Sequence, residues 1–295
     1  MSLVRVRGRA TGHRLAGAAR PDTTATGGPG PQLTWAPPAL TNPLRLVVTR
    51  RNNFLDLDNS RDYILDCRTE VFDRQVNIKG GRRVVLIGGE WYLDPADPRG
   101  RDTGIGLRDQ PAGAVVHLEG LKITGRPVDG IFIKQPNAVT VQIQNYYCNG
   151  PGTADEASGW PGLHPDLIQM SDFPGGTLRI DRLTGVAAYQ GIFLEPDDNG
   201  LAVPAGVDIR NVDITTRPTV GGIKTRLYLS DGVVYPWSVQ NFYIQYDTGD
   251  VAPIFDPSRT PALQMDFPGV TLGLAPTPMV DPNLVGINYR SPGYL

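Results

Sequence analysis

The sequence predicts an all-β solenoid, a coil of parallel strands in which each turn stacks on the previous one. Three observations carry this prediction. The 295 residues include 35 glycines and 27 prolines, more than helix-rich domains carry. A pattern of alternating apolar residues with one bend recurs five times, and a short apolar strand comes ahead of each copy. Units of several short strands with no helix between them cannot form βαβ units, so a coil of stacked strands is expected.

The repeated pattern is apolar–x–apolar–x–x–apolar–x–apolar. Alternation predicts a strand with one buried face, and the two-residue interruption predicts a tight bend. The copies span 116–123, 141–148, 178–185, 207–214 and 237–244, and their starts are 25, 37, 29 and 30 residues apart. The second residue of each bend is Gly120, Asn145, Arg182, Asn211 or Asn241. Glycine and asparagine tolerate the left-handed backbone conformation that a tight bend requires.

The strands ahead of the bends span 104–107, 130–134, 167–170, 191–195 and 222–229. Aligning them predicts which side chains face the core, because side chains alternate along a strand. Ile131, Ile168 and Ile192 should stack inside. Two rows should stack outside, about 4.8 Å per step. These rows are Phe132–Gln169–Phe193 and Lys134–Ser171–Glu195.

These features resemble the right-handed parallel β-helices of the pectate-lyase-like superfamily. The repeat, the asparagine at the bend and the stretch "VNIKGGRRVVLIGG" (76–89) carry the resemblance. That stretch is similar to the opening I-x-G-G-x-x-V-x-I-x-G of such solenoids, and the resemblance covers about residues 60–247. It implies a fold rather than one activity, since this fold hosts lyases, hydrolases, epimerases, esterases and non-enzymatic spikes. A β-sandwich, the competing architecture, would not place the same bend at the same point of each unit.

The chain divides into an extended basic arm (1–50), a parallel β-helix (51–250) and a proline-rich C-terminal extension (251–295). The arm holds seven arginines against one acid, Asp22, whereas the remainder holds 21 basic and 29 acidic residues. Such an arm either contacts an acidic partner or forms a solvated tail. The extension carries eight prolines together with apolar residues. We expect it to pack on the body or to form an oligomer contact.

Several classes of protein are not expected. No stretch of 18 apolar residues could span a membrane, and the N-terminus has no apolar core of a secretory signal. The two cysteines, Cys67 and Cys148, are expected to be reduced thiols. The three histidines, His13, His117 and His164, have no metal-site spacing. With no phosphate loop and no dinucleotide fingerprint, we expect neither a cofactor nor a metal.

The stretch "HPDLIQ", His164 to Gln169, is the start of a candidate saccharide surface. Aromatic rings cover the apolar face of a sugar, while amides and charged groups bind its hydroxyls. The predicted ligand-binding residues are Phe132, Lys134, Trp160, His164, Gln169 and Phe193.

Glycoside hydrolysis needs two carboxyl groups at a defined separation. The candidates for this catalytic role are Asp166, Glu195 and Asp197. The same residues also have simpler structural interpretations. Residues 195–198 could form a polar turn, and His164 with Asp166 could be a structural pair. Residues 222–226 faintly resemble the R-I-K stretch of polygalacturonase-type hydrolases, but the N-T-D and G-H-G motifs of that family are missing.

The sequence therefore predicts a virion-type spike that binds cell-surface, capsular polysaccharide and is attached to a larger particle by its N-terminal arm. In architecture this resembles the tailspike or head-spike proteins of phages and gene transfer agents. That resemblance implies a homo-oligomer, with a trimer as the expected state, made in the cytoplasm without a signal peptide and displayed on a particle surface. Nucleic acid is not expected as a partner. The alternatives are a polysaccharide-degrading hydrolase or lyase and a purely structural particle component.

Overall fold

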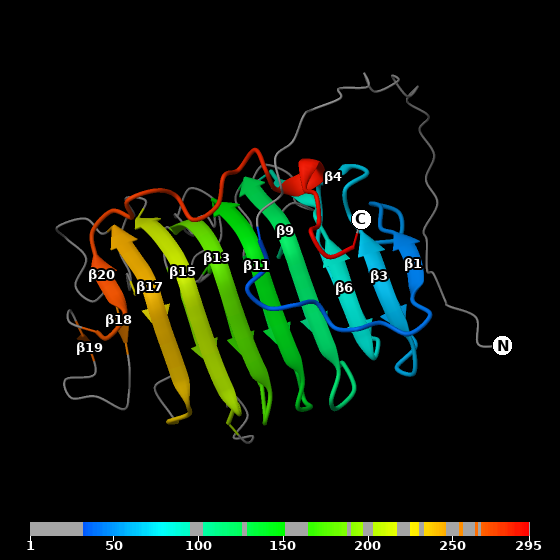
Figure 1. The fold of residues 1–295 in the computed structure, drawn as a ribbon, viewed down its shortest axis with the longest axis horizontal. Coiled ribbons are helices and arrows are strands. Elements are labelled where there is room, and N and C mark those ends of the chain that lie inside the picture. The colour runs from blue at the N-terminus through cyan, green and yellow to red at the C-terminus, as the bar shows by residue number, and fades with distance from the viewer. Residues whose placement is uncertain are drawn as a thin grey trace.

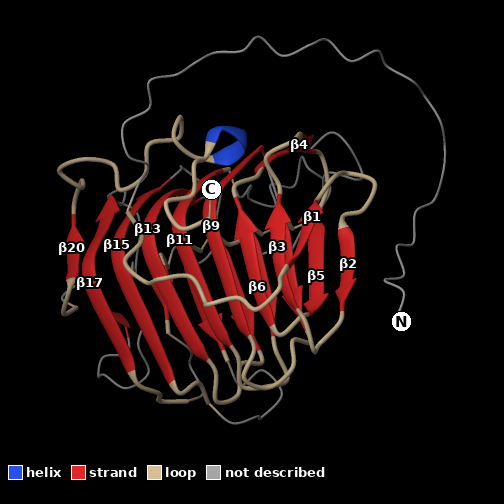
Figure 2. Ribbon diagram, turned by 45° about the vertical axis from the view of Figure 1, so that its right-hand side comes forward, coloured by secondary structure: helices blue, strands red, loops and turns tan. Residues whose placement is uncertain are grey.

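The chain folds as a right-handed parallel β-helix with two long sheets (Figures 1 and 2). The computed structural model describes residues 32–94, 103–125, 129–150, 165–187, 190–196, 203–216, 225–229, 233–245, 254–255, 263–264 and 267–294. Most successive strands alternate between the two sheets, and most pair in parallel with the equivalent strand of the next coil. The solenoid predicted from the sequence is confirmed.

Sheet A has 11 strands and follows the order β1-β3-β6-β9-β11-β13-β15-β17-β20, with β4 and β7 beside this path. Its strands are β1 (Leu44–Val47), β3 (Asp62–Asp66), β4 (Val71–Phe72), β6 (Arg83–Ile87), β7 (Glu90–Leu93), β9 (Val115–Gly125), β11 (Thr140–Asn149), β13 (Thr177–Ala187), β15 (Gly206–Thr216), β17 (Trp237–Gln245) and β20 (Val270–Leu272).

Sheet B has nine strands, and among its pairs only β18 with β19 runs antiparallel within the described part of the chain. Its strands are β2 (Phe54–Leu57), β5 (Val76–Gly80), β8 (Ile105–Arg108), β10 (Ile131–Lys134), β12 (Ile168–Ser171), β14 (Ile192–Glu195), β16 (Leu227–Tyr228), β18 (Ile254–Phe255) and β19 (Leu263–Gln264). Strand β1 lies within the stretch 1–50, and β18 to β20 lie within the stretch 251–295.

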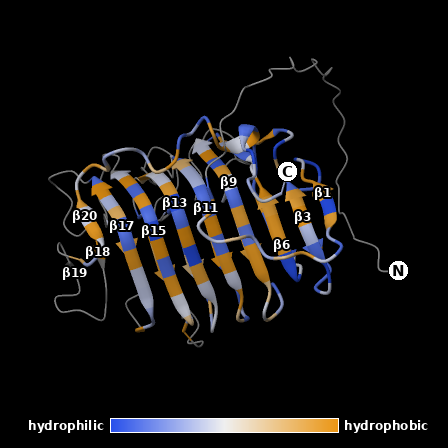
Figure 3. Cartoon of the chain, viewed as in Figure 1, coloured by the Kyte–Doolittle hydropathy of each residue, from blue (hydrophilic) through white to orange (hydrophobic). Residues whose placement is uncertain are grey.

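One apolar core fills the interior of the coil along its length. Ile131, Ile168 and Ile192 are in register on three consecutive strands of sheet B and are fully buried. Figure 3 shows the alternation as bands of apolar and polar residues across the strands of sheet A. Each buried residue stacks on its counterpart in the next coil, so the core is a set of continuous rows.

The long strands of sheet A bend where the sequence predicts. All five bend residues have a positive φ, from 51° at Asn241 to 72° at Gly120. The bend lets one strand pair with its neighbour on both sides of a corner. The predicted asparagine row is short: the Asn241 side-chain amide donates to the Asn211 side chain at 3.1 Å. Arg182 interrupts the row, and the Asn145 amide donates to the Tyr289 hydroxyl instead.

Residues 32–43, the N-terminal strap, cross the outer face of sheet A from β11 towards β1 (Figure 1). Gln144 on β11 accepts the backbone N–H groups of Thr34 and Trp35 at 2.8 and 3.0 Å and donates to the Trp35 carbonyl. The Trp35 ring lies near the guanidinium groups of Arg179 and Arg210, 5.9 and 5.3 Å from its centroid. The strap therefore packs on the body of its own chain.

Residues 274–294, the C-terminal tail, cross the same face (Figure 1). A second apolar cluster forms there from outward residues of sheet A and from Val280, Val285 and Tyr289 of the tail. The Tyr294 hydroxyl donates to the Pro38 carbonyl, so the strap and the tail also contact each other. Segments from both ends of the chain thus cover part of sheet A.

Gly120 is the most constrained bend residue, and replacing it tests how the tail packs. A Cβ added there would overlap the Tyr289 ring, and φ is +72°. We expect Gly120→Ala to lower the free energy of unfolding by about 2–4 kcal/mol, measured by urea denaturation. Gly113→Ala is the control, because φ there is +77° but nothing lies within 4 Å of the added carbon. Equal losses for the two variants, or an excess loss at Gly120 that persists after Tyr289→Ala, would contradict this packing.

Candidate binding face on sheet B

One row of outward positions on sheet B runs across seven consecutive coils. The register aligns each member with the next. In coil order the row is Phe54, Asn77, Gly106, Phe132, Gln169, Phe193 and Tyr228. Neighbouring members are about 4.8 Å apart along the coil axis. The row therefore presents aromatic rings, amides and one glycine along a line.

The aromatic rings of this row are held by their neighbours yet remain accessible. Phe193 stacks on Tyr228, with ring centroids 4.6 Å apart, and both are partly exposed. The Arg108 guanidinium lies 5.0 Å from the centroid of the Phe132 ring. Phe54, at the N-terminal end, is 63% exposed. Partly exposed rings beside amides are the groups that bind sugar rings.

An open depression of about 660 Å³ interrupts the row near its N-terminal end. It is lined by Phe54, Leu55, Asp56, Gln75, Asn77, Ile78, Lys79, Arg108 and Asp109. Gly106 contributes no side chain here, and a Cβ at this position would meet the Asn77 and Gln75 amides. The Asn77 amide donates to the Gln75 side-chain carbonyl at 2.9 Å, which fixes both groups. The volume lies within the usual range of ligand pockets.

A second outward row runs beside the first, two residues further along each strand. Its members are Asp56, Lys79, Arg108, Lys134, Ser171 and Glu195. Lys79 pairs with Asp109 at 3.3 Å, and Lys134 pairs with Asp172 at 3.0 Å. Three cations occupy consecutive coils in the middle of the row. The face therefore offers charged donors next to the aromatic line.

The predicted site residues separate into three groups. Phe132, Gln169 and Phe193 are outward neighbours in the predicted order, and Lys134 and Glu195 lie in the adjacent row. Asp166 is fully buried, so it does not lie on this face. Trp160, His164 and Asp197 lie outside the described residues.

Asp166 and Glu195 are not a pair of catalytic carboxyl groups in this arrangement. Asp166 aligns with Gln190 of the next coil, five residues before Glu195, since Ile168 pairs with Ile192. That offset is about 16 Å along the strand direction. Carboxyl groups of glycoside hydrolases lie about 5–10 Å apart. Asp166 is also buried, whereas Glu195 is on the outer row.

Asp166 lies instead beside a second buried acid, Asp129 of the preceding coil. The Asp166 backbone N–H donates to Asp129 Oδ1 at 3.2 Å, and the Thr103 hydroxyl donates to Asp129 Oδ2 at 3.3 Å. Burial raises the pKa of Asp129 to about 7. Burial and the neighbouring Asp129 raise the pKa of Asp166 well above its usual value. The pair is part of the coil corner and not of the exposed face.

The outer face of sheet A differs, because the strap and the tail cover part of it. His117 and Glu119 point outward from β9 but are fully buried. His117 Nδ1 and Gln142 Oε1 are 2.9 Å apart, and His117 Nε2 and Glu119 Oε2 are 3.3 Å apart. The Tyr289 hydroxyl of the tail lies 3.5 Å from Glu119 Oε2. Of these groups, Glu119 contacts the tail, through the Tyr289 hydroxyl.

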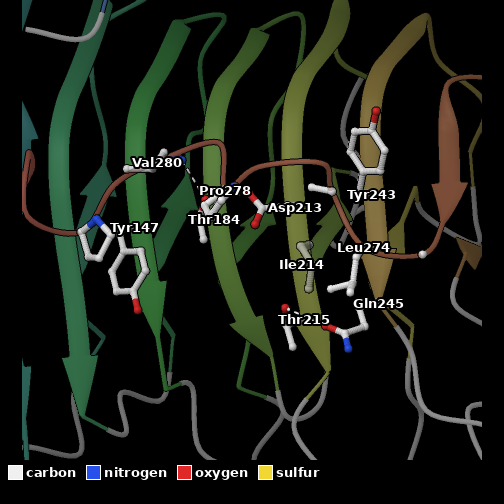
Figure 4. A pocket seen from close by; sticks show the side chains of 13 residues that line it. Tyr147, Thr184, Asp213, Ile214, Thr215, Tyr243, Gln245, Leu274, Pro278 and Val280 are labelled. Atoms are coloured by element: carbon white, nitrogen blue, oxygen red, sulfur yellow. Dashed lines mark hydrogen bonds between the residues drawn. The ribbon is translucent and has the colours of Figure 1, made fainter.

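Beyond this covered part, a depression of about 440 Å³ lies between sheet A and the tail (Figure 4). Asp213 accepts the Thr184 hydroxyl at 2.6 Å and the Met279 N–H at 3.0 Å. Burial raises the pKa of Asp213. Tyr147 and Tyr243 stand on either side of the tail in this view. The polar groups at the centre bind the tail itself.

Sequence reasoning missed Phe54, Tyr228 and the depression at Gly106. The residue-by-residue alignment began at the fourth strand of sheet B, so it did not reach Phe54. Tyr228 lies within the expected strand 222–229, which was not aligned residue by residue with the three strands before it.

In comparisons with protein-family models, curated proteins and solved structures, nothing matched this chain. In the described part of the chain, no helix is long and apolar enough to cross a membrane.

The raised pKa of Asp129 predicts that the protein, freed of metal ions with EDTA, becomes less stable as the pH rises from about 4 to 7. In this window the folded state keeps a proton that the unfolded chain, with its Asp pKa near 3.8, releases. Asp129 alone should account for a few kcal/mol of this loss. The raised pKa of Asp166 acts in the same direction and extends the decline. Asp129→Asn should make the profile of unfolding free energy against pH shallower, while Asp166 keeps part of the slope.

Acids with a lowered pKa act in a different window. The pKa of Asp62 is lowered mainly by Arg82, and that of Asp66 mainly by Arg68. Their contribution is lost only as the pH falls through those lowered values, so it does not mask the decline between pH 4 and 7. If the unfolding free energy of the wild type does not change between pH 4 and 7, the raised pKa of Asp129 is wrong.

Proposed function

We propose that this chain is a recognition protein that binds an extended polysaccharide along the outer face of sheet B. The observation that carries the proposal is the in-register row of aromatic and amide side chains, from Phe54 to Tyr228. A polymer of sugar rings repeats along its length, and so does this row. Rings bind the apolar faces of successive sugars, and the amides and cations bind hydroxyl or carboxylate groups.

The accessibility of the face supports the same proposal. The strap and the tail cross sheet A, whereas the row on sheet B stays partly exposed in the described residues. The depression beside Gly106 adds a concave subsite at the N-terminal end of the row. Concave sites with few polar groups and apolar walls are typical of small-ligand binding.

We further propose that the protein is a spike on a phage-like particle and that residues 1–31 attach it. Five of the seven arginines of the arm lie in residues 1–31. The strap that packs on the body begins after this stretch, at residue 32. In a density gradient of lysate from the source organism, the whole chain should sediment with tail- or capsid-containing particles. A chain lacking residues 1–31 should remain in the soluble fraction, and co-sedimentation of both forms would contradict the assignment.

A polysaccharide-degrading enzyme remains the second candidate, because two carboxyl groups, Asp56 and Asp109, line the same depression. They belong to the first and third coils of sheet B, about 10 Å apart along the axis. This is near the upper limit of the separation in inverting glycoside hydrolases. Release of reducing ends from a bound polymer, abolished by Asp109→Asn, would favour the enzyme.

Replacing rings of the row should weaken binding to polysaccharide. We expect Phe193→Ala and Gln169→Ala each to raise the Kd by about tenfold, or ~1.4 kcal/mol. The measurement is affinity electrophoresis on alginate, polygalacturonate, hyaluronan, dextran and capsular polysaccharide of the source organism. Tyr92→Ala is the control, because Tyr92 is an aromatic residue of sheet A that is 55% exposed. Retention that Tyr92→Ala reduces as much as Phe193→Ala would place the binding elsewhere. If none of these polysaccharides retards the protein, the proposal is wrong for the polymers tested.

A further inference from the structure

Three buried oxygen atoms at one corner of the coil have no hydrogen-bond donor. They are Oδ1 and Oδ2 of Asp166 and Oε1 of Gln190. Asp166 is fully buried and Gln190 is 4% exposed. Buried polar atoms in folded proteins are nearly always paired, so each exception needs a physical account. The three atoms belong to two residues on adjacent coils, which suggests one shared cause.

The backbone places Asp129, Asp166 and Gln190 at the same position of three consecutive coils. Each lies two residues before an isoleucine, and these isoleucines are in register on β10, β12 and β14. Neighbouring coils are about 4.8 Å apart. The link from the Asp166 N–H to Asp129 Oδ1 shows that the first two residues are in direct contact. Oxygen-bearing side chains thus stack as a short ladder.

The charge of this ladder is not balanced by any ion pair formed in the described residues. Neither Asp129 nor Asp166 takes part in one. The charged group that acts on Asp166 is Asp129, and it acts unfavourably. Burying an ionised carboxylate without a partner is very costly, and two such groups repel each other. Neutral pH therefore requires that the pair binds either a proton or a cation.

We propose that Asp129, Asp166 and Gln190 form a binding site for one Ca²⁺ ion. Two carboxylates balance a divalent charge, and the unpaired oxygens of Asp166 and Gln190 supply ligands. Asp129 contributes as well, because each of its oxygens accepts one hydrogen bond and keeps a second lone pair. All of these metal ligands are hard oxygen atoms, which favour calcium over zinc.

Calcium also fits better than magnesium. Ca²⁺ accepts irregular sets of six to eight oxygen ligands, whereas Mg²⁺ demands near-ideal octahedral geometry and keeps several waters. A ladder of side chains from stacked coils is such an irregular set. No three His, Cys, Asp or Glu side chains gather in the described residues, so two acids and one amide define the site. Because the site contains no histidine, the spacing of histidines in the sequence could not indicate it.

The bound ion would join three consecutive coils at the corner that precedes strands β10, β12 and β14. Its effect is on stability, and it is independent of polysaccharide binding on the outer face. By linking the coils, calcium should raise the stability of the folded chain.

The test is thermal unfolding of the whole chain at pH 7.5, first in EDTA and then in CaCl₂ or MgCl₂ at 1 mM free ion. Calcium should raise the Tm of wild type by at least about 5 °C, and magnesium should raise it much less. Isothermal titration with CaCl₂ should give one site per chain. Asp166→Asn should abolish both effects, and Gln190→Leu should weaken binding several-fold.

Asp281→Asn is the matched control, because Asp281 is an exposed acid in a turn of the tail and should leave the calcium response unchanged. The proposal fails if calcium does not shift the Tm of wild type. In that case Asp166→Asn in EDTA should be more stable than wild type, and the pair holds only a proton. If Asp166→Asn does not fold, the titration of wild type decides alone. Polysaccharide binding by the calcium-free protein bears on the proposed function and not on this site.

Discussion

The structure depends on the in-register hydrogen bonding of each coil to the next. Parallel pairing aligns each strand residue with its counterpart one turn away. Between β13 and β15, for example, ten residue pairs are aligned in this way. A side chain is therefore never placed alone: it belongs to a row, and the whole row shares its environment. Apolar rows fill the core, and rows that point outward become surfaces. The bends at positive φ maintain this register, because each long strand turns at the same point and then resumes pairing on the next side of the coil.

The same constraint explains why the two faces differ. Outward rows of sheet A before the bend carry polar groups such as Gln144 and Asp181, which bind the strap, and Glu119, which contacts Tyr289 of the tail. Outward rows of sheet B carry rings and a glycine and are not crossed by either segment in the described residues. A row of carboxylates at the coil corner is a third case. There the stacking forces two acids together in the interior, and the cost of this arrangement favours a bound cation.

Local and periodic features of the fold could be predicted from sequence. The bends at Asn145 and Asn211 are marked by residue type, and the row of Phe132, Gln169 and Phe193 follows from aligning the repeats. Features set by contacts distant in sequence could not. The strap and the tail have no periodic pattern, so nothing in the sequence placed them on sheet A. Asp166 was a candidate for catalysis because acids on adjacent coils could form a carboxyl pair, and its full burial depends on the surrounding coils. The depression at Gly106 likewise needs the Asn77 side chain of the preceding coil.

A polymer bound along the row on sheet B should shield that row from solvent. Hydroxyl-radical footprinting of the protein, with and without a polysaccharide that it binds, measures this shielding. We expect protection of Phe132, Phe193 and Tyr228 together, because they belong to one row. Tyr92 on sheet A should be labelled equally with and without the polymer. Protection of Tyr92, or of Tyr147 and Tyr243 beside the tail, with sheet B still labelled would contradict binding along this row.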